Sequence, residues 1–194
     1  MIRRRAVLAL VPLAVVGGCT KPDRAGMAPA PGPSSTGPNT TDIAWLQLLI
    51  AMNERLLPVL DLVPPRSGDP AVQLFASVTR RARAAELDSL RGLAAGVTLP
   101  SDNPHLQHEM PGMPTAAQTA ALTGATGKKF DREFAAVVIA HLDQTSRLCT
   151  GEQNAGADPA FRSLAEAIAR SVGEERARAS ALDARAASPA ANTP

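Results

Sequence analysis

The feature that most constrains this fold is an internal repeat at a constant spacing of 89 residues. Asp42 recurs as Asp131, the run 69–71 (Asp-Pro-Ala) recurs at 158–160, and Glu86 recurs as Glu175. A single helical hairpin cannot bury its own apolar faces, so two copies are expected to pack against each other. The repeat therefore predicts an all-α, pseudo-symmetric four-helix bundle made of two tandem helical hairpins.

Apolar residues recur at helical spacing in four segments, as expected for helices with one buried face. The four stripes are Trp45, Leu49, Met52, Leu56 and Val59; Val72, Phe75, Ala76, Thr79, Leu90 and Leu93; Phe130, Phe134, Val137, His141 and Leu148; and Phe161, Leu164, Ile168, Val172, Ala179 and Leu182. Asp69 and Asp158 each precede a proline, the order of an N-cap and a first helical residue. The sequence predicts hairpins at 41–96 and 128–187, a crossover loop at 97–127 and a disordered tail at 188–194.

The N-terminus has the organisation of a cleavable export signal. Arginines at positions 3–5 precede an apolar run, 6–16, that ends at Gly-Gly-Cys19,. The run is shorter than the roughly 20 apolar residues that a bilayer core requires. Cys19 after two small residues resembles a bacterial lipobox, so we expect a signal peptide at 1–18 and acyl chains such as palmitate on Cys19. Two or more chains would hold the protein on the outer face of the cell membrane; a secreted form without lipid is the alternative.

Composition narrows the classes of function. Residues 19–40 are rich in Pro, Gly, Ser and Ala and are expected to form a flexible linker,. Loss of the signal peptide removes three of the 20 basic residues and none of the 18 acidic ones, so the charge of +2 becomes about −1. That balance predicts no nucleic-acid partner. Cys149 would be left unpaired, with a half-buried hydrophobic role. We expect no enzymatic activity, because no catalytic spacing or phosphate loop is recognisable.

Three segments resemble the bacterial family of domains of unknown function named DUF305. They are TDIAWLQLLIAMNE (41–54), GDPAVQLFASVTRRARAAELDSLRGL (68–93) and MPGMPTAAQTAALTGATGKKFDREFAAVVIAH (110–141). The resemblance implies a ferritin-like bundle in an exported protein, often rich in Met and His and sometimes found near metal-resistance functions. The family pattern has a His-His pair in its first and third helices. Those positions are Met52-Asn53 and His141-Leu142 here, so only His141 matches.

The inward faces carry one candidate metal site. Met52 and His141 occupy one repeat position, and Glu86 and Glu175 another. The sequence lacks the Glu-x-x-His motif of di-iron bundles. Counting along the first hairpin also sets Met52 and Glu86 about 9 Å apart in level at 1.5 Å per residue. The alternative is a buried His bonded to a neighbour, with glutamates paired to arginines; the candidate arginines are Arg83, Arg170 and Arg176.

A second candidate lies in the crossover loop, where His105, His108, Met110 and Met113 fall within nine residues. Imidazole and thioether groups together suit copper, and thioethers suit Cu(I) in particular. The alternative is a polar, proline-punctuated crossover whose methionines pack against the bundle.

Two hypotheses follow for function. The first is a non-catalytic, membrane-anchored lipoprotein that binds or buffers a metal ion, with copper the best match. The second is a structural or protein-interaction lipoprotein of the envelope whose family metal site has been lost.

Overall fold

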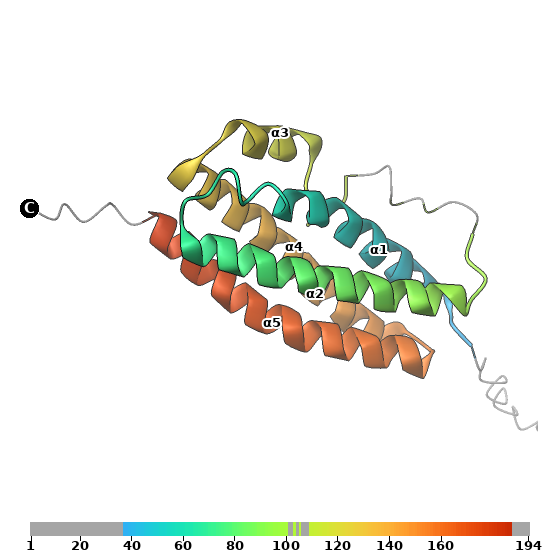
Figure 1. The fold of residues 1–194 in the computed structure, drawn as a ribbon. Helices are drawn as coiled ribbons and strands as arrows, with labels where there is room; N and C mark the ends of the chain where they lie inside the picture. Colours follow the sequence, from blue (N-terminus) through green and yellow to red (C-terminus); the bar gives the residue numbers. More distant parts are fainter. Residues whose placement is uncertain (1–36, 101–102, 104, 106–108, 188–194) are drawn as a thin grey trace, which may run out of the picture. The chain divides into compact units, whose positions relative to one another are not determined.

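The computed structural model describes residues 37–100, 103, 105 and 109–187. The secondary structure of these residues consists of five helices without a strand (Figure 1). They are α1 (Thr40–Leu60), α2 (Pro70–Ala95), α3 (Ala116–Gly124), α4 (Gly127–Ala155) and α5 (Pro159–Ala187). The predictions for the signal peptide, Cys19, His108 and the tail fall outside the described residues.

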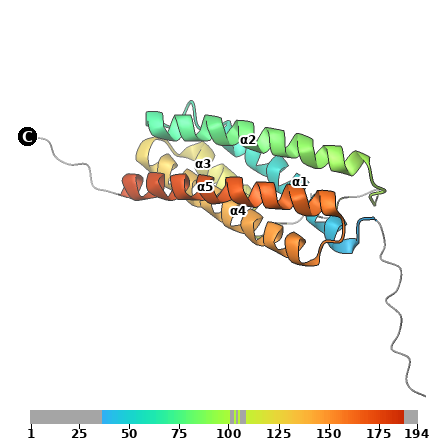
Figure 2. The same ribbon diagram turned by 90° about the horizontal axis from the view of Figure 1, so that it is seen from below.

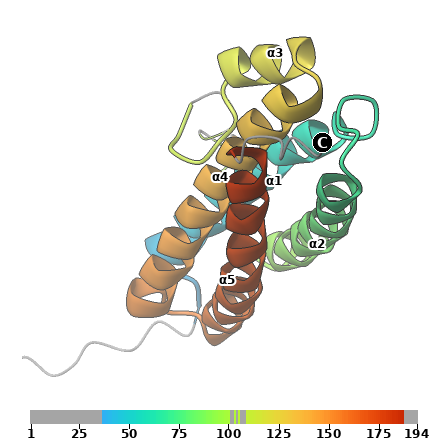
Figure 3. The same cartoon turned by 90° about the vertical axis from the view of Figure 1, so that its left-hand side faces the viewer.

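The four long helices form two hairpins that pack against each other. Helix α1 contacts α2, and α4 contacts α5; across the hairpins, α1 contacts α4 and α2 contacts α5. Figure 2 shows α2 and α5 side by side, and Figure 3 looks along the helices, with α3 outside the four-helix arrangement. The predicted all-helical bundle of two hairpins is confirmed.

The core consists of the predicted stripes. Almost all residues of the four stripes are buried. The exceptions are partly buried and pack against the edge of the core; they are Leu93, Leu148, Leu164 and Leu182. Aromatic rings link the hairpins, because Trp45 of α1 lies 6.2 Å from Phe161 of α5 between ring centroids. Phe75 of α2 lies 6.4 Å from Phe134 of α4. Burial of these apolar faces is the main force that holds the hairpins together.

Helix starts follow the predicted capping chemistry. Asp69 accepts a hydrogen bond of 2.7 Å from the Ala71 amide, and Asp158 accepts one of 2.8 Å from the Ala160 amide. Each satisfies an amide that has no partner inside its own helix. Asn39 also caps α1, in a capping box with Asp42.

The segment 97–127 was predicted to be a crossover loop throughout. This prediction is wrong in part, because the segment contains helix α3. Thr115 and Gln118 form a capping box at its start, with the Gln118 amide 3.1 Å from the Thr115 hydroxyl. Leu122 buries against the bundle, and α3 packs on α4. A helix of nine residues has too few turns to show a clear apolar stripe.

Helix α1 is the one described helix long and apolar enough to cross a bilayer. Most of its apolar side chains are buried against the other helices. Its composition therefore agrees with that of a core helix.

Candidate functional site

A buried ionic cluster lies inside the bundle and joins three helices. Arg83 of α2 is 1% exposed, and its NH1 lies 3.0 Å from Glu86 Oε2. Its NH2 donates a hydrogen bond of 3.0 Å to Oε1 of Glu175 on α5. Asn53 of α1 donates to Glu86 Oε1 at 2.8 Å, and Ser171 donates to Glu175 Oε1 at 3.1 Å. One guanidinium therefore bridges both glutamates.

The repeat explains this arrangement. Glu86 and Glu175 are repeat equivalents, so the pseudo-symmetry brings both carboxylates to the interior, where Arg83 lies against each. The interpretation that arginine partners the glutamates is confirmed for Arg83. The other two candidate arginines pair elsewhere, Arg170 with Glu166 and Arg176 with Asp143.

The residue count along the first hairpin predicted that Glu86 lies at a different height from Met52, and this prediction is wrong. Asn53, next to Met52, bonds directly to Glu86. The count assumed a tight turn, but residues 61–69 run on past the end of α1 before α2 begins (Figure 1). Asn53 lies seven residues before the end of α1, and Glu86 lies 16 residues after the start of α2. The bond between them therefore requires the two helix ends to be offset by about 13 Å at 1.5 Å per residue.

Arg83 already supplies positive charge to both glutamates. Burial raises the pKa of Glu86, whereas Arg83 and the bond from Asn53 lower it in part. Buried carboxylates are costly unless they are paired or bound to a cation. A metal ion at Glu86 and Glu175 would have to displace the guanidinium.

His141 is the second notable polar group in the core. It is fully buried, and neither ring nitrogen makes a well-formed hydrogen bond with a described residue. Burial, with a further contribution from the charge of Arg83, lowers its pKa to about 3, although the Gly112 backbone opposes this weakly. The imidazole is therefore neutral, with an unprotonated nitrogen in an apolar setting.

A methionine turn lies against the helix segment that carries His141. The Met113 amide donates to the Met110 carbonyl at 3.0 Å, and Gly112 has a positive φ of 81°. A Cβ at Gly112 would lie 2.4 Å from Cβ of Gln144, so the turn touches α4 closely. Met113 is buried in the core and Met110 is partly buried. The structure thus brings Met110, Met113 and His141 into one region.

The remaining predicted ligands lie elsewhere. His105 lines a hollow with Thr40, Trp45 and Arg147, and its backbone amide bonds to Asn103. Met52 is fully buried in the core. In the part of the chain that the structure describes, no group of three or more His, Cys, Asp or Glu side chains could hold a metal ion. A site here would depend on thioether ligands.

Cys149 lies in α4, fully buried, with no disulfide to another described residue. Burial, with the charge of Glu86 adding to it, raises the pKa of its thiol to about 12. The thiolate is the reactive form of cysteine, so this thiol is chemically inert. The expected small, hydrophobic role fits, although Cys149 is wholly rather than half buried.

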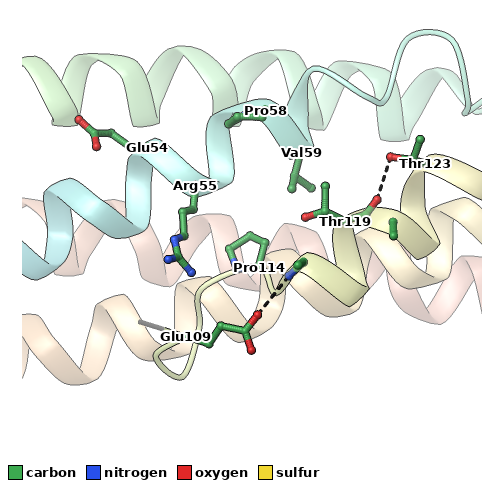
Figure 4. A pocket seen from close by; sticks show the side chains of 10 residues that line it. Glu54, Arg55, Pro58, Val59, Glu109, Pro114, Thr119 and Thr123 are labelled. Atoms are coloured by element: carbon green, nitrogen blue, oxygen red, sulfur yellow. Dashed lines mark hydrogen bonds between the residues drawn. The ribbon is translucent and has the colours of Figure 1, made fainter. Parts of the chain in front are cut away.

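A surface groove of about 840 Å³ runs between α1 and α3. Figure 4 shows Glu54, Arg55 and Pro58 along α1, with Pro114 and Thr119 on the other side. Its acidic groups already have partners: Glu54 pairs with Arg91, and Glu109 accepts from the Ala116 amide. The groove therefore offers no buried charge that calls for a ligand.

Sequence reasoning missed the polar partners of two buried acids, Glu86 and Asp42. Asn53 completes the Arg83 cluster, and a faint signal existed because it occupies a family histidine position. Glu152 is buried beside Asp42. Nothing in the sequence pairs these two, since they lie far apart along the chain.

The comparisons with known proteins agree with this architecture. The model of the family described as Domain of unknown function (DUF305) matches residues 42–182. The chain belongs to the DUF305 family. No curated protein matches the sequence significantly.

Two solved structures share the fold. One is a DUF305 protein from Streptomyces coelicolor described as secreted, with 19% identity, a TM-score of 0.68 and coverage of 79% of this chain and 98% of that one. The other is a DUF305 fragment from Deinococcus radiodurans, with 16% identity, a TM-score of 0.68 and coverage of 76% of this chain and 97% of that one. The resemblance predicted from the sequence is confirmed at the level of family and fold.

Proposed function

We propose that the protein is an exported, non-catalytic domain held at the outer face of the cell membrane by lipid on Cys19. The charged, apolar and small-residue segments of 1–18 support export,. The S. coelicolor relative described as secreted agrees with an extracytoplasmic location. Cys19→Ser is expected to move the protein from the membrane fraction to the soluble fraction. Unchanged membrane association would refute the anchor.

For the domain itself, we propose reversible binding of one soft metal ion, Cu(I), at His141 with thioether ligands from the Met110–Met113 turn. The observation that carries the proposal is the buried, neutral imidazole without a well-formed hydrogen bond. A buried polar group without a partner is costly, and a coordinated cation would offset that cost. Neutral imidazole with thioether is a ligand set that suits copper.

The charges nearby favour a monovalent ion. The positive charge of Arg83 lowers the pKa of His141 and would also oppose a cation on the same ring. Coulomb repulsion doubles for a divalent ion at the same distance. Two buried glutamates on Arg83 offset its charge in part. We therefore expect Cu(I) to bind, and Cu(II) and Zn(II) to bind weakly.

The test is a titration of the mature chain carrying Cys19→Ser with Cu(I), Cu(II) and Zn(II). Met113→Leu keeps the packing volume and removes the sulfur, and His141→Leu removes the imidazole. Each is expected to weaken Cu(I) binding at least tenfold, whereas His105→Ala, in the separate hollow, leaves it unchanged. Failure of the unmodified chain to bind Cu(I) tighter than micromolar would refute the metal proposal.

A second candidate function is docking to a protein of the envelope. Leu74 is 65% exposed and Val78 is 39% exposed on α2, beside a hollow shared with Leu182 of α5. Exposed apolar side chains that gather at a hollow are typical of interaction surfaces. A photoreactive side chain at position 74 is expected to give one discrete cross-linked adduct in cells. The same side chain at the exposed position 89 is expected to give none. Adducts of equal yield at both positions would argue against docking.

A further inference from the structure

The carboxylate of Asp42 joins the start of α1 to the turn between α4 and α5. Its oxygens accept hydrogen bonds from the backbone amides of Asn39 at 2.6 Å, Ala157 at 3.1 Å and Asp158 at 3.2 Å. The Asn39 side chain adds a bond of 2.8 Å to the Ala155 carbonyl. One fully buried side chain therefore connects two segments that are remote in sequence, the start of α1 and the α4–α5 turn.

Glu152, in the last turn of α4, is buried against the same carboxylate. The residue is 1% exposed, and its two carboxyl oxygens are buried without a hydrogen bond from a described donor. Its side chain lies within hydrogen-bonding reach of Asp42. A Cβ at Gly156 would lie 2.0 Å from Glu152 Oε1, so the turn closes tightly over this acid. Two carboxyl groups at such a site cannot both carry charge without a large cost.

The charged and titratable groups around Glu152 come from every neighbouring element. Asp42 faces it from α1, and His105 lines the same hollow from the segment that precedes α3. The rest are Asp158 and Arg162 at the start of α5, and Arg147 and Cys149 on α4. Asp42 and Asp158 therefore act on Glu152 with negative charge, and Arg162 opposes them.

The pKa values of the two acids diverge accordingly. Burial, then the hydrogen bond and charge of Asp42, raise the pKa of Glu152 to about 8, although Arg162 opposes this. Burial would raise the pKa of Asp42 too, but the bonds from Glu152 and the three amides outweigh it and leave it below its usual value. A protonated Glu152 can therefore donate its O–H to an ionised Asp42, which gives each acid a partner.

We propose that Asp42 and Glu152 form a proton-operated latch that holds the start of α1 against the α4–α5 turn and opens as pH rises. Opening exposes Glu152 to water, where it releases its proton at any pH above its ordinary pKa of 4.5. The open state thus binds one proton fewer than the closed state. Linkage then raises the opening equilibrium constant about tenfold per pH unit between roughly 5 and 8. Above about 8 the closed state also loses its proton, and the dependence levels off.

Amide hydrogen exchange of the mature chain carrying Cys19→Ser tests the latch. The amides of Ala157 and Asp158, corrected for intrinsic exchange rates, are expected to lose protection about tenfold per pH unit from 5 to 8. Glu152→Gln keeps the shape of the acid and cannot titrate, so its protection factors are expected to stay constant. Glu166→Gln, at an exposed acid, is the matched control and should keep the dependence of the unmodified chain.

Two outcomes would overturn the latch. One is constant protection in the unmodified chain over this range, and the other is an unchanged slope in Glu152→Gln. Direct titration of the Glu152 carboxyl carbon by NMR gives a measurement that needs no variant. A midpoint near 8 supports the latch, and a midpoint near 4.5 refutes it.

Discussion

Two pairs of buried carboxyl groups lie in this bundle, and their charge is neutralised in different ways. Glu86 and Glu175 share the guanidinium of Arg83, 3.0 Å from each. Asp42 and Glu152 lie against each other, and the raised pKa of Glu152 favours a proton rather than a cation as the balancing charge there. A fixed cation therefore balances the first pair, whereas we expect the second pair to respond to pH.

The difference comes from how each pair relates to the repeat. Glu86 and Glu175 are equivalent positions, so the symmetry of the bundle brings them together. Asp42 recurs as Asp131, but the repeat position of Glu152 in the first half is Val63. Val63 is fully buried and cannot titrate. Pseudo-symmetry thus brought Glu86 and Glu175 together, whereas a departure from it placed Glu152 beside Asp42.

The largest expected effect is that of Arg83→Met. This change removes the cation and leaves two buried carboxylates uncompensated, which typically costs about 3–5 kcal/mol of stability. Urea denaturation at pH 7 measures the loss. Adding Glu86→Gln and Glu175→Gln to the same chain is expected to recover a large part of it. If the two Gln substitutions recover none of the lost stability, Arg83 acts through packing rather than through its charge.

Glu175→Gln makes a smaller change to the same cluster. It removes one charged partner of Arg83 and weakens the bond from Ser171. Hydrogen bonds to charged groups contribute about 1.5–3 kcal/mol each, and a loss in that range is expected in urea denaturation. Glu174→Gln next to it is the control, because Glu174 is exposed and its partner Arg178 lies 3.8 Å away. A loss as large for Glu174→Gln would contradict the assignment.

Gly156→Ala tests the tight closure over Glu152. The added methyl group would lie 2.0 Å from the Glu152 carboxyl and 2.6 Å from its carbonyl oxygen. Overpacking of this kind costs about 1–3 kcal/mol. Gly151→Ala is the matched control, because nothing lies within 4 Å of its Cβ and alanine in a helix interior is favoured over glycine by about 0.5–1 kcal/mol. Opposite signs in thermal melts are therefore expected for the two variants.

The sequence predicted those parts of this structure that depend on local pattern. Apolar periodicity located the four long helices, and Asp-Pro pairs located two of their starts. The capping box of Thr115 and Gln118, which begins α3, is also visible in the sequence. The helix itself is too short to show an apolar periodicity. Burial of His141 followed from its place on a stripe.

The missed contacts depend on the path of the chain between elements. Asn53 meets Glu86 because residues 61–69 carry the chain past the end of α1, and no local signal states how far such a connection runs. Asp42 meets Glu152 because the connection between α4 and α5 is short, whereas the connection between α1 and α2 is long. Helical periodicity assigns each residue to one face of its helix. The connections and the packing decide which residues of two facing helices lie at the same height along the bundle.

The smallest expected effect separates the two acid pairs most directly. At pH 4 Glu152 is protonated in the folded chain and largely protonated in the unfolded chain, because folding raises its pKa from 4.5 to about 8. Glu152→Gln then replaces one neutral hydrogen-bond donor by another and should change stability by under about 0.5 kcal/mol. The raised pKa of Glu152 favours the folded protein fully below pH 4.5, and this contribution is lost as pH rises through 8. The unmodified chain should therefore lose stability relative to Glu152→Gln between these values, as measured by urea denaturation at each pH. Glu175→Gln leaves Glu152 in place and should therefore keep the pH dependence of the unmodified chain. A parallel response of the two variants to pH would mean that a proton does not distinguish the two pairs.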